Sequence, residues 1–348
     1  MATDRLLTSA QSTSPEDESL GLALRPESIA EYVGQRDLIE RLIIAIEAAR
    51  SRGEALEHVL LHGPPGLGKT TLAHVIAHEM GSRAIVTSGP ALARGTDLVS
   101  ALTRLGERDV LFIDEIHRLP AAVEEFIYPA MEDYRVDVTV DSGLNARTIQ
   151  IKVRPFTLIG ATTRAGLLTA PLRSRFGLAH HLRFYPPEDL TRILARSASL
   201  LGIESPEPAA LVAIAERSRG TPRIANRLLR RVRDFASVRS GGVFTREVVD
   251  RALSLEGVDA LGLDELDRTF LRVIATTYAG GPVGLETIAA TMSEDAATLE
   301  DVVEPYLLQL GFLARTRRGR MLTRSACEHL GVPFRGNIDP SDPDLLNA

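Results

Sequence analysis

Tryptophan is absent from the chain, aromatic residues make up only 5% of it, and the single cysteine is Cys327. One cysteine excludes an intrachain disulfide bond, and nothing in the sequence points to an oxidising compartment. So few aromatic side chains argue against a protein that binds single-stranded nucleic acid by stacking on its bases. No apolar run approaches the roughly 18 residues of a membrane-spanning helix.

The chain also lacks an excess of positive charge, because its formal net charge is −6. Binding of nucleic acid through an overall basic field is thereby disfavoured, and any such contact must be local. The first 20 residues lack the apolar core of a signal peptide. We therefore expect a cytoplasmic protein with a disordered segment at residues 1–19. Its 348 residues predict two or three domains.

Residues 63–70 read GPPGLGKT, the pattern of a phosphate-binding loop, between an apolar run and a helix-like segment. Glycines let the backbone N–H groups surround a phosphate, and the following helix points the positive end of its dipole at the same anion. Lys69 supplies a charge for the β- and γ-phosphates, and Thr70 a hydroxyl for Mg²⁺. The alternative is a glycine-rich turn before an ordinary helix. The residues predicted to bind ATP here are Gly63, Gly66, Gly68, Lys69, Thr70 and Thr71.

The string VLFIDEIH, residues 110–117, is an apolar run that ends in two acids. Uniformly apolar strands are typical of a parallel sheet covered on both faces, and ligands gather at the carboxyl ends of such strands. We predict that Asp114 holds the Mg²⁺ shell and that Glu115 polarises an attacking water. The alternative is that the two acids merely begin a helix.

A two-residue period follows, in which Val136 and Val138 precede a DSGLNAR turn and Ile149 and Ile151 come after it. This alternation predicts a β-hairpin insertion near 134–155. Such a hairpin either packs on its own domain or projects to bind a partner, and the sequence leaves both open.

The next buried strand, FTLIGATT, spans residues 156–163. Its polar end is expected beside Glu115, so Thr163, or failing that Thr162, is placed to hydrogen-bond the attacking water or the γ-phosphate. The string APLRSRFG then predicts a short helix with Arg173 and Arg175. Arginine supplied by a neighbouring subunit can neutralise transition-state charge in P-loop ATPases, and Arg175 is the candidate. These elements complete a large α/β domain over residues 20–184.

Residues 185–258 carry a helical pattern with no strand signal and predict a small helical domain. Within it, Thr221 and Pro222 form a good helix start, with Arg223 in the first turn. Because a basic residue is unfavourable at a helix N-terminus unless an anion compensates it, Arg223 is a plausible phosphate sensor.

The segment 259–335 reads as three helices followed by two short strands, the order of a winged helix-turn-helix. The helix in the usual reading position is acidic, with Glu294, Asp295, Glu300, Asp301 and Glu304, and such acidity repels phosphate. The wing instead is basic, so we expect it to contact the DNA backbone without reading sequence, unless it is only a solvated loop. Its arginines are Arg315, Arg317, Arg318 and Arg320. Residues 336–348 are expected to form a flexible tail.

The motif order GPPGLGKT, FIDEIHRL, GATTRAG, LRSRFG and GTPRIANRLLRR closely resembles the RuvB family of AAA+ ATPases, the motors of Holliday-junction branch migration. The resemblance covers about residues 20–335. It implies a P-loop AAA+ domain with a parallel sheet, a small helical domain and a winged-helix domain, assembled as a hexameric ring on duplex DNA. It further implies ATP and Mg²⁺ as cofactors, a RuvA-like junction-binding partner and a RuvC-like resolvase, in DNA recombination and repair.

The resemblance also implies contacts that the residue pattern does not derive. Leu24 and Arg25 match a segment against the nucleotide base, Tyr185 matches a residue that closes the same pocket, and MEDYR matches another nucleotide-binding stretch at Glu132, Asp133 and Tyr134. In the wing, Arg315 and Arg320 match DNA-contacting arginines, although Arg317 stands where the family often has proline. A RuvA-like domain would dock on the hairpin through Leu144, Ile149 and Ile151.

Two other functions remain open at this stage. A clamp-loader-like or protein-remodelling ATPase would use the same nucleotide site. A winged-helix DNA-binding regulator, switched by ATP, belongs to another class, but the acidic second helix of the turn motif argues against it.

Overall fold

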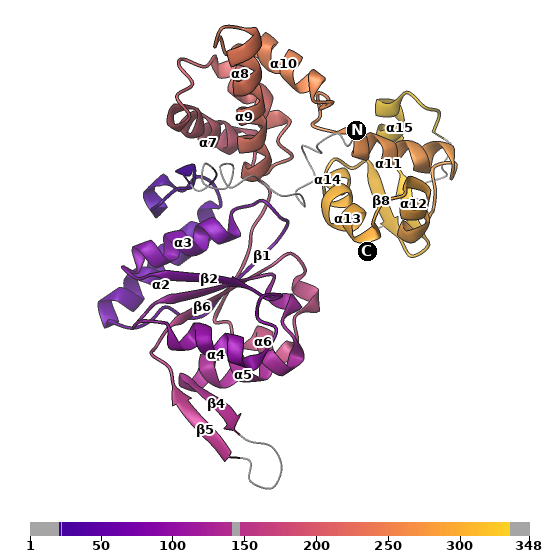
Figure 1. The fold of residues 1–348 in the computed structure, drawn as a ribbon. Helices are drawn as coiled ribbons and strands as arrows, with labels where there is room; N and C mark the ends of the chain where they lie inside the picture. Colours follow the sequence, from indigo (N-terminus) through magenta and orange to yellow (C-terminus); the bar gives the residue numbers. More distant parts are fainter. Residues whose placement is uncertain (1–20, 22, 141–146, 335–348) are drawn as a thin grey trace. The chain divides into compact units, whose positions relative to one another are not determined.

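The computed structural model describes residues 21, 23–140 and 147–334, which form two compact units that meet in sequence between Tyr185 and Pro186 (Figure 1). The first unit contains a parallel β-sheet covered by helices, and the second contains a small helical domain and a winged-helix domain. The predicted fold class is therefore confirmed. The segments expected at residues 1–19 and 336–348 lie outside the described residues.

All neighbouring strands of the main sheet run parallel, in the order β2-β3-β6-β1-β7. The central strands are apolar and buried because helices cover both faces. Strand β6 lies between β1 and β3, so the polar residues that follow these three strands come together at one edge. The strands are β1 (Val59–His62), β2 (Ala84–Ser88), β3 (Val110–Asp114), β6 (Thr157–Thr162) and β7 (Leu178–His181).

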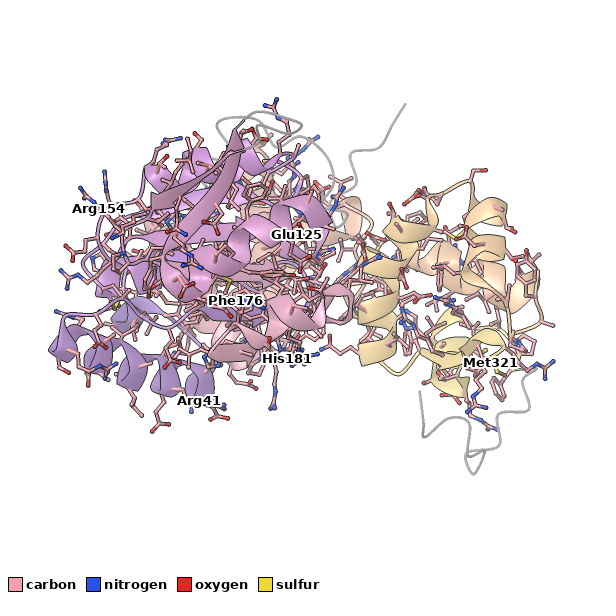
Figure 2. All side chains as sticks on the ribbon, turned by 90° about the horizontal axis from the view of Figure 1, so that it is seen from below. Arg41, Glu125, Arg154, Phe176, His181 and Met321 are labelled. Atoms are coloured by element: carbon pink, nitrogen blue, oxygen red, sulfur yellow. The ribbon has the colours of Figure 1, made fainter. Side chains whose placement is uncertain are left out.

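Strand β7 was not predicted from the sequence. It has only four residues, LAHH, and two of them are histidines, so it carries no clear apolar pattern. Pairing with β1 defines it, in a register that places His62 opposite His181. The two imidazole rings stack with their centroids 4.9 Å apart (His181 is labelled in Figure 2).

Helices lie on both faces of this sheet, with α3 on one and α4, α5 and α6 on the other (Figure 1). The amphipathic spacing predicted for the first long helix is confirmed in α2, where Leu38, Leu42, Ile46 and Ala49 are the buried residues. The helices of this unit are α2 (Arg36–Arg52), α3 (Lys69–Glu79), α4 (Gly95–Thr103), α5 (Ala121–Asp133) and α6 (Ala170–Ser174).

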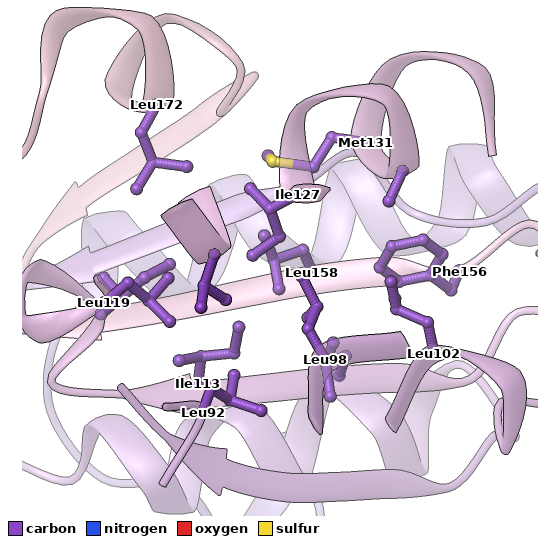
Figure 3. Packing of buried hydrophobic residues seen from close by; sticks show 14 of the residues in the cluster. Leu92, Leu98, Leu102, Ile113, Leu119, Ile127, Met131, Phe156, Leu158 and Leu172 are labelled. Carbon is purple, nitrogen blue, oxygen red and sulfur yellow. The ribbon is translucent and has the colours of Figure 1, made fainter. Parts of the chain in front are cut away.

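The core under α4 and α5 holds the motif-bearing strands in place (Figure 3). Ile113 of β3 and Leu158 of β6 pack there against Leu98 of α4 and Ile127 of α5, and all four side chains are fully buried. Each such burial contributes about 1.5–3 kcal/mol. The acids after β3 are therefore presented by a strand that has little freedom to move.

The predicted insertion is an antiparallel hairpin of β4 (Arg135–Val140) and β5 (Arg147–Lys152), which projects from the sheet-bearing unit in Figure 1. Its base packs on its own domain, because Val136 is fully buried and Val153 nearly so. Further out, Ile149 is 51% exposed. Packing on its own domain therefore holds for the base of the hairpin, and binding of a partner by the outer part stays a prediction.

The second unit begins with the small helical domain, whose helices are α7 (Pro187–Leu200), α8 (Pro208–Glu216), α9 (Pro222–Arg239) and α10 (Arg246–Leu255). The winged-helix domain follows with α11 (Glu265–Thr276), α12 (Leu285–Met292), a helical stretch α13-η4-α14 over Ala296–Gln309, strands β8 (Leu313–Thr316) and β9 (Gly319–Leu322), and α15 (Arg324–Leu330). Within the described ranges, no helix is long and apolar enough to cross a membrane.

A buried ion pair joins these two domains. Arg219, immediately before α9, is 4% exposed and binds both carboxylate oxygens of Asp267, which is fully buried in the first turn of α11. Its Nε also donates to the Gly262 carbonyl at 2.9 Å, and its guanidinium lies 5.2 Å from the ring centroid of Tyr306. Burial raises the pKa of the Asp267 carboxyl, and the Arg219 charge opposes that shift.

The pH dependence of stability should include a contribution from His58, just before β1. Its Nδ1 accepts the Leu158 N–H at 2.9 Å, its Nε2 lies 3.0 Å from the Met131 carbonyl, and burial lowers its pKa. Since the folded-state pKa is the lower one, protonation favours the unfolded chain, and stability falls as the pH decreases below about 6.5. We expect His58→Asn to lose less thermal stability than the wild type between pH 7.5 and 5.5, measured by calorimetry. An equal fall in melting temperature in the wild type and His58→Asn would contradict a contribution from His58.

Candidate nucleotide site and nucleic-acid interface

The loop after β1 has the backbone that phosphate binding requires. Gly63, Gly66 and Gly68 have φ values of 138°, 80° and 93°, which residues with a Cβ rarely adopt. At Gly63 a Cβ would also lie 2.5 Å from the Leu182 carbonyl oxygen. The loop therefore turns tightly between β1 and α3, with the N-terminus of α3 directed at its interior.

Lys69, the first residue of α3, is held inside this loop. Its side chain is 7% exposed, and its Nζ donates to the carbonyl oxygens of Gly63 at 2.9 Å and Pro64 at 2.8 Å. The ammonium charge is thus fixed at the mouth of the loop. Thr70 and Thr71 follow in the first turn of α3 and are partly buried.

The two acids differ in how the structure presents them. Asp114 ends β3, and its Oδ1 accepts the Glu115 N–H at 3.0 Å. Glu115 lies beyond the strand with φ of 49°, in the left-handed region, and its side chain is 34% exposed. A left-handed conformation is costly for glutamate and is retained where the surrounding structure imposes it.

The threonines at the end of β6 also differ. Thr162 is fully buried, its Oγ1 accepts the Arg164 N–H at 3.0 Å and lies 2.8 Å from Nδ1 of His117. Thr163 follows the strand and is partly exposed. Because the Thr162 hydroxyl is already engaged, the geometry favours Thr163 as the γ-phosphate contact.

A tyrosine pair lies against the loop. The hydroxyls of Tyr32 and Tyr185 are 3.1 Å apart, and that of Tyr185 donates to the Leu67 carbonyl at 3.4 Å. A Cβ at Gly68 would lie 3.5 Å from the Tyr32 hydroxyl, and burial raises the pKa of Tyr32 well above its usual value. Sequence reasoning included Tyr185 but missed Tyr32, for which no motif gave a signal.

The segment before Tyr32 runs beside α3. Leu24 is 6% exposed. The pKa of His74 in α3 is lowered, mainly by burial and to a smaller extent by the charge of Arg25. Tyr185 therefore contacts the P-loop directly, and Arg25 lies near α3, the helix that follows the P-loop.

Arg175 and the MEDYR residues form a separate group. The Arg175 Nη2 lies 3.0 Å from Oε1 of Glu132, and its guanidinium lies 4.3 Å from the ring centroid of Tyr128. Tyr134 packs edge-on against Phe156 at the amino end of β6, whereas the P-loop follows the carboxyl end of the adjacent β1. The structure therefore does not bring Glu132, Asp133 and Tyr134 to the P-loop of the same chain.

In the small helical domain, Arg223 occupies the first turn of α9, as predicted, and is exposed. Arg227, one turn further, is largely buried. The pKa of Arg227 is lowered to about 10. Burial is the largest cause, and the charges of Arg223, Arg219 and neighbouring arginines add to it. Positive charge concentrated at a helix N-terminus favours an anion there. The burial of Arg227 depends on tertiary packing, which the sequence pattern does not show.

The wing forms as predicted, but two of its arginines share a buried carboxylate. Glu304 is fully buried and accepts from Nε and Nη2 of Arg315 and from Nε of Arg320, the last at 2.6 Å. Glu304 therefore does not add to the acidic face that was expected of this helix. The Arg315 side chain is 43% exposed and that of Arg320 only 19%, whereas Arg317 and Arg318 at the turn are exposed.

The residues expected on the hairpin are only partly described. Leu144 lies outside the described residues. Ile149 is exposed, and Ile151 is partly buried two residues closer to the base of the hairpin. The docking role expected for this hairpin therefore stays a prediction.

Three family models match the chain in succession. The model of the Holliday junction DNA helicase RuvB P-loop domain matches residues 24–182. The RuvB AAA lid domain model matches residues 185–259, and the RuvB C-terminal winged helix domain model matches residues 260–331.

Solved structures give the same result. The Thermotoga maritima RuvB Holliday junction branch migration motor is 50% identical, with a TM-score of 0.81 over 89% of this chain and 99% of that chain. A lysine-to-arginine variant of that protein is 51% identical, with a TM-score of 0.82 over 89% of this chain and 98% of that one. An arginine-to-alanine variant of the same protein is 50% identical, with a TM-score of 0.80 over 89% of this chain and 98% of that one.

The arginines of the wing should separate into two classes. Replacing Arg317 and Arg318 together by alanine should lower the salt dependence of duplex DNA binding by up to about 0.9 for each phosphate that the wing no longer neutralises, with unchanged thermal stability. Arg320→Ala should instead lower the melting temperature, because it removes one of the two partners of buried Glu304. Fluorescence anisotropy across a salt series and calorimetry give the two readouts. If the salt dependence of DNA binding is unchanged in the Arg317 and Arg318 double variant, these residues do not contact DNA. If the melting temperature of Arg320→Ala is unchanged, Arg320 does not stabilise buried Glu304.

Proposed function

The chain belongs to the RuvB family, and from this premise we propose how its residues carry out ATP-driven branch migration of Holliday junctions. It is a P-loop ATP hydrolase of the AAA+ type, and its winged-helix domain belongs to a family that acts on junction DNA. The observation that carries the proposal is the convergence of GPPGLGKT, Asp114-Glu115 and Thr163 at the carboxyl ends of three adjacent parallel strands. The family match favours this function over a clamp-loader-like machine or an ATP-switched regulator.

In the proposed reaction, the loop N–H groups and Lys69 bind the phosphates of ATP, and Glu115 accepts a proton from the attacking water. The water oxygen bonds to the γ-phosphorus as the bond to the bridging oxygen breaks, which leaves ADP and phosphate. Thr163, at the end of β6, contacts the γ-phosphate or the water. The protein's contribution is mainly positioning and electrostatic stabilisation, as in other phosphoryl transfers.

Nucleotide binding follows from the family, and we propose Mg²⁺ as the accompanying ion. Thr70 and Asp114 are oxygen donors, the ligand type that Mg²⁺ prefers, and two protein groups suffice because Mg²⁺ keeps waters and phosphate oxygens as its other ligands. Within the described residues, no cluster of three or more histidine, cysteine or acidic side chains could hold a metal alone. Bound there, the ion would neutralise charge on the β- and γ-phosphates.

We propose that two further arginines complete the site. Arg223, at a basic helix N-terminus, senses the γ-phosphate. Arg175 acts on the nucleotide of a neighbouring copy, with Glu132, Asp133 and Tyr134 on the same subunit face. Two observations support this: Arg175 ion-pairs with Glu132, and the packing of Tyr134 keeps this group away from the P-loop of its own chain. A homo-hexameric ring would provide one such neighbour for every P-loop.

The remaining assignments follow from the family and the exposed surfaces. The wing, through Arg315, Arg317, Arg318 and Arg320, contacts the backbone of duplex DNA. The tip of the hairpin, with Leu144, Ile149 and Ile151, docks a RuvA-like junction-binding protein, and a RuvC-like resolvase joins the assembly. We place the large domain at residues 20–184, the helical domain at 185–258, the winged helix at 259–335, and the protein in the cytoplasm, where its DNA substrate would lie.

Branch migration of a synthetic four-way junction tests the function directly. With a RuvA-like partner and ATP, the wild type should convert the junction to duplex products. Glu115→Gln should bind ATP but hydrolyse it and migrate the junction at least about 100-fold more slowly, because an amide cannot accept the proton. Lys69→Ala, which should fail to bind ATP, is the matched control. Wild-type turnover by Glu115→Gln would overturn the assignment of the base.

Mixing two inactive variants tests the shared site. Arg175→Ala subunits keep an intact P-loop, whereas Lys69→Ala subunits keep an intact Arg175, so some interfaces of a mixed ring would hold both. We expect the mixture to regain measurable ATP hydrolysis that neither variant shows alone. If rings shown by mass spectrometry to be mixed remain inactive, Arg175 does not act across the interface.

A further inference from the structure

One side chain links Glu115 to β6, the strand that Thr163 follows. His117, in the 3₁₀ turn Ile116–Arg118, is 7% exposed and lies between two polar groups. Its Nδ1 is 2.8 Å from the Thr162 hydroxyl, and its Nε2 is 3.4 Å from Oε2 of Glu115. The same string, DEIH, thus supplies both the proposed base and a neighbour that reaches it.

The groups on either side of the imidazole favour one tautomer. The Thr162 hydroxyl accepts the Arg164 N–H at 3.0 Å and has its own proton to donate to Nδ1, 2.8 Å away. Nε2 of a neutral imidazole then carries the ring proton and directs it at the carboxylate. The opposite tautomer would place the Nε2 lone pair against the carboxylate oxygens, which is unfavourable. The polar contacts therefore run from Thr162 through His117 to Glu115: a hydrogen bond joins Thr162 to His117, and an approach of 3.4 Å joins His117 to the carboxylate.

The anchored end of this chain is rigid. Thr162 is the last residue of β6, which pairs in parallel with β1, and the Thr162 side chain is fully buried. Glu115, by contrast, lies outside the sheet in a left-handed conformation, and its side chain is partly exposed. Without a partner, a glutamate with several rotatable bonds would populate many rotamers. A donor fixed to β6 restricts that freedom at one carboxylate oxygen and leaves the other for water.

We propose that His117 is a positioning residue that orients the Glu115 carboxylate and ties it to the strand carrying the γ-phosphate contact. This inference rests on the proposed role of Glu115. His117 itself transfers no proton in the reaction. Because Thr162 immediately precedes Thr163, the anchor of His117 and the proposed γ-phosphate contact are consecutive residues, so the base and that contact share one rigid support.

The test replaces His117 in the full-length protein and measures steady-state ATP turnover with duplex DNA. His117→Ala should lower kcat on the order of 10- to 100-fold with KM changed less than about threefold, because a misplaced base affects the transition state and not ground-state binding. His117→Gln, whose amide nitrogen can take the place of Nε2, should recover part of kcat. His117→Asn, which reaches only toward Thr162, should not recover it.

A double-mutant comparison separates positioning from folding. If His117 acts through Glu115, adding His117→Ala to Glu115→Gln should lower turnover no further. Wild-type kcat in His117→Ala, equal kcat in the Gln and Asn variants, or a loss that follows a lowered melting temperature would each overturn the proposal. Wild-type turnover in Glu115→Gln would instead overturn the proposed base, so the two failures are distinguishable.

Discussion

Parallel pairing of β6 with both β1 and β3 is the constraint on which the nucleotide site depends. The register is fixed by buried residues along all three strands, so their carboxyl ends cannot slide relative to one another without exposing a core. The phosphate loop, the two acids and the threonines are thereby held at one edge from segments about 100 residues apart in sequence. The left-handed backbone of Glu115 is a local strain that this rigid support makes tolerable, whereas the loop glycines adopt positive φ without strain.

The sequence predicted this convergence because its signals are local. A P-loop is recognisable from eight residues, apolar runs identify buried strands, and the polar residue after each run must lie at the common edge. Strand β7 escaped prediction because its four residues include two histidines, and only its pairing with β1 makes it a strand. The partners of charged and titratable side chains were likewise not predicted, because these contacts depend on tertiary packing. His117 contacts Thr162, which lies 45 residues further along the chain, and no local sequence pattern at either residue predicts that contact.

The winged-helix domain shows how tertiary pairing changes the meaning of a charge pattern. From the sequence, the helix before the wing is a row of acids and the wing a row of bases. In the structure the last acid, Glu304, is buried under the wing and bound by two of its arginines. A buried carboxylate without partners would be very costly, so these arginines first support their own fold. What remains for the proposed DNA contact is the exposed part of Arg315, the smaller exposed part of Arg320 and the two arginines at the turn.

The Arg219–Asp267 pair has a consequence for how this chain can be divided. A fragment that ended after α10 would leave a buried guanidinium without its carboxylate, and one that began at α11 would leave the carboxylate without its guanidinium. Each fragment would lose this ion pair and open the remaining partner to water, whereas in the intact chain replacing one partner alone, with the other still buried, costs about 3–5 kcal/mol. The helical domain and the winged helix are thus poor candidates for separate exchange between proteins. Recombination of genes would have to carry them together, with both partners intact.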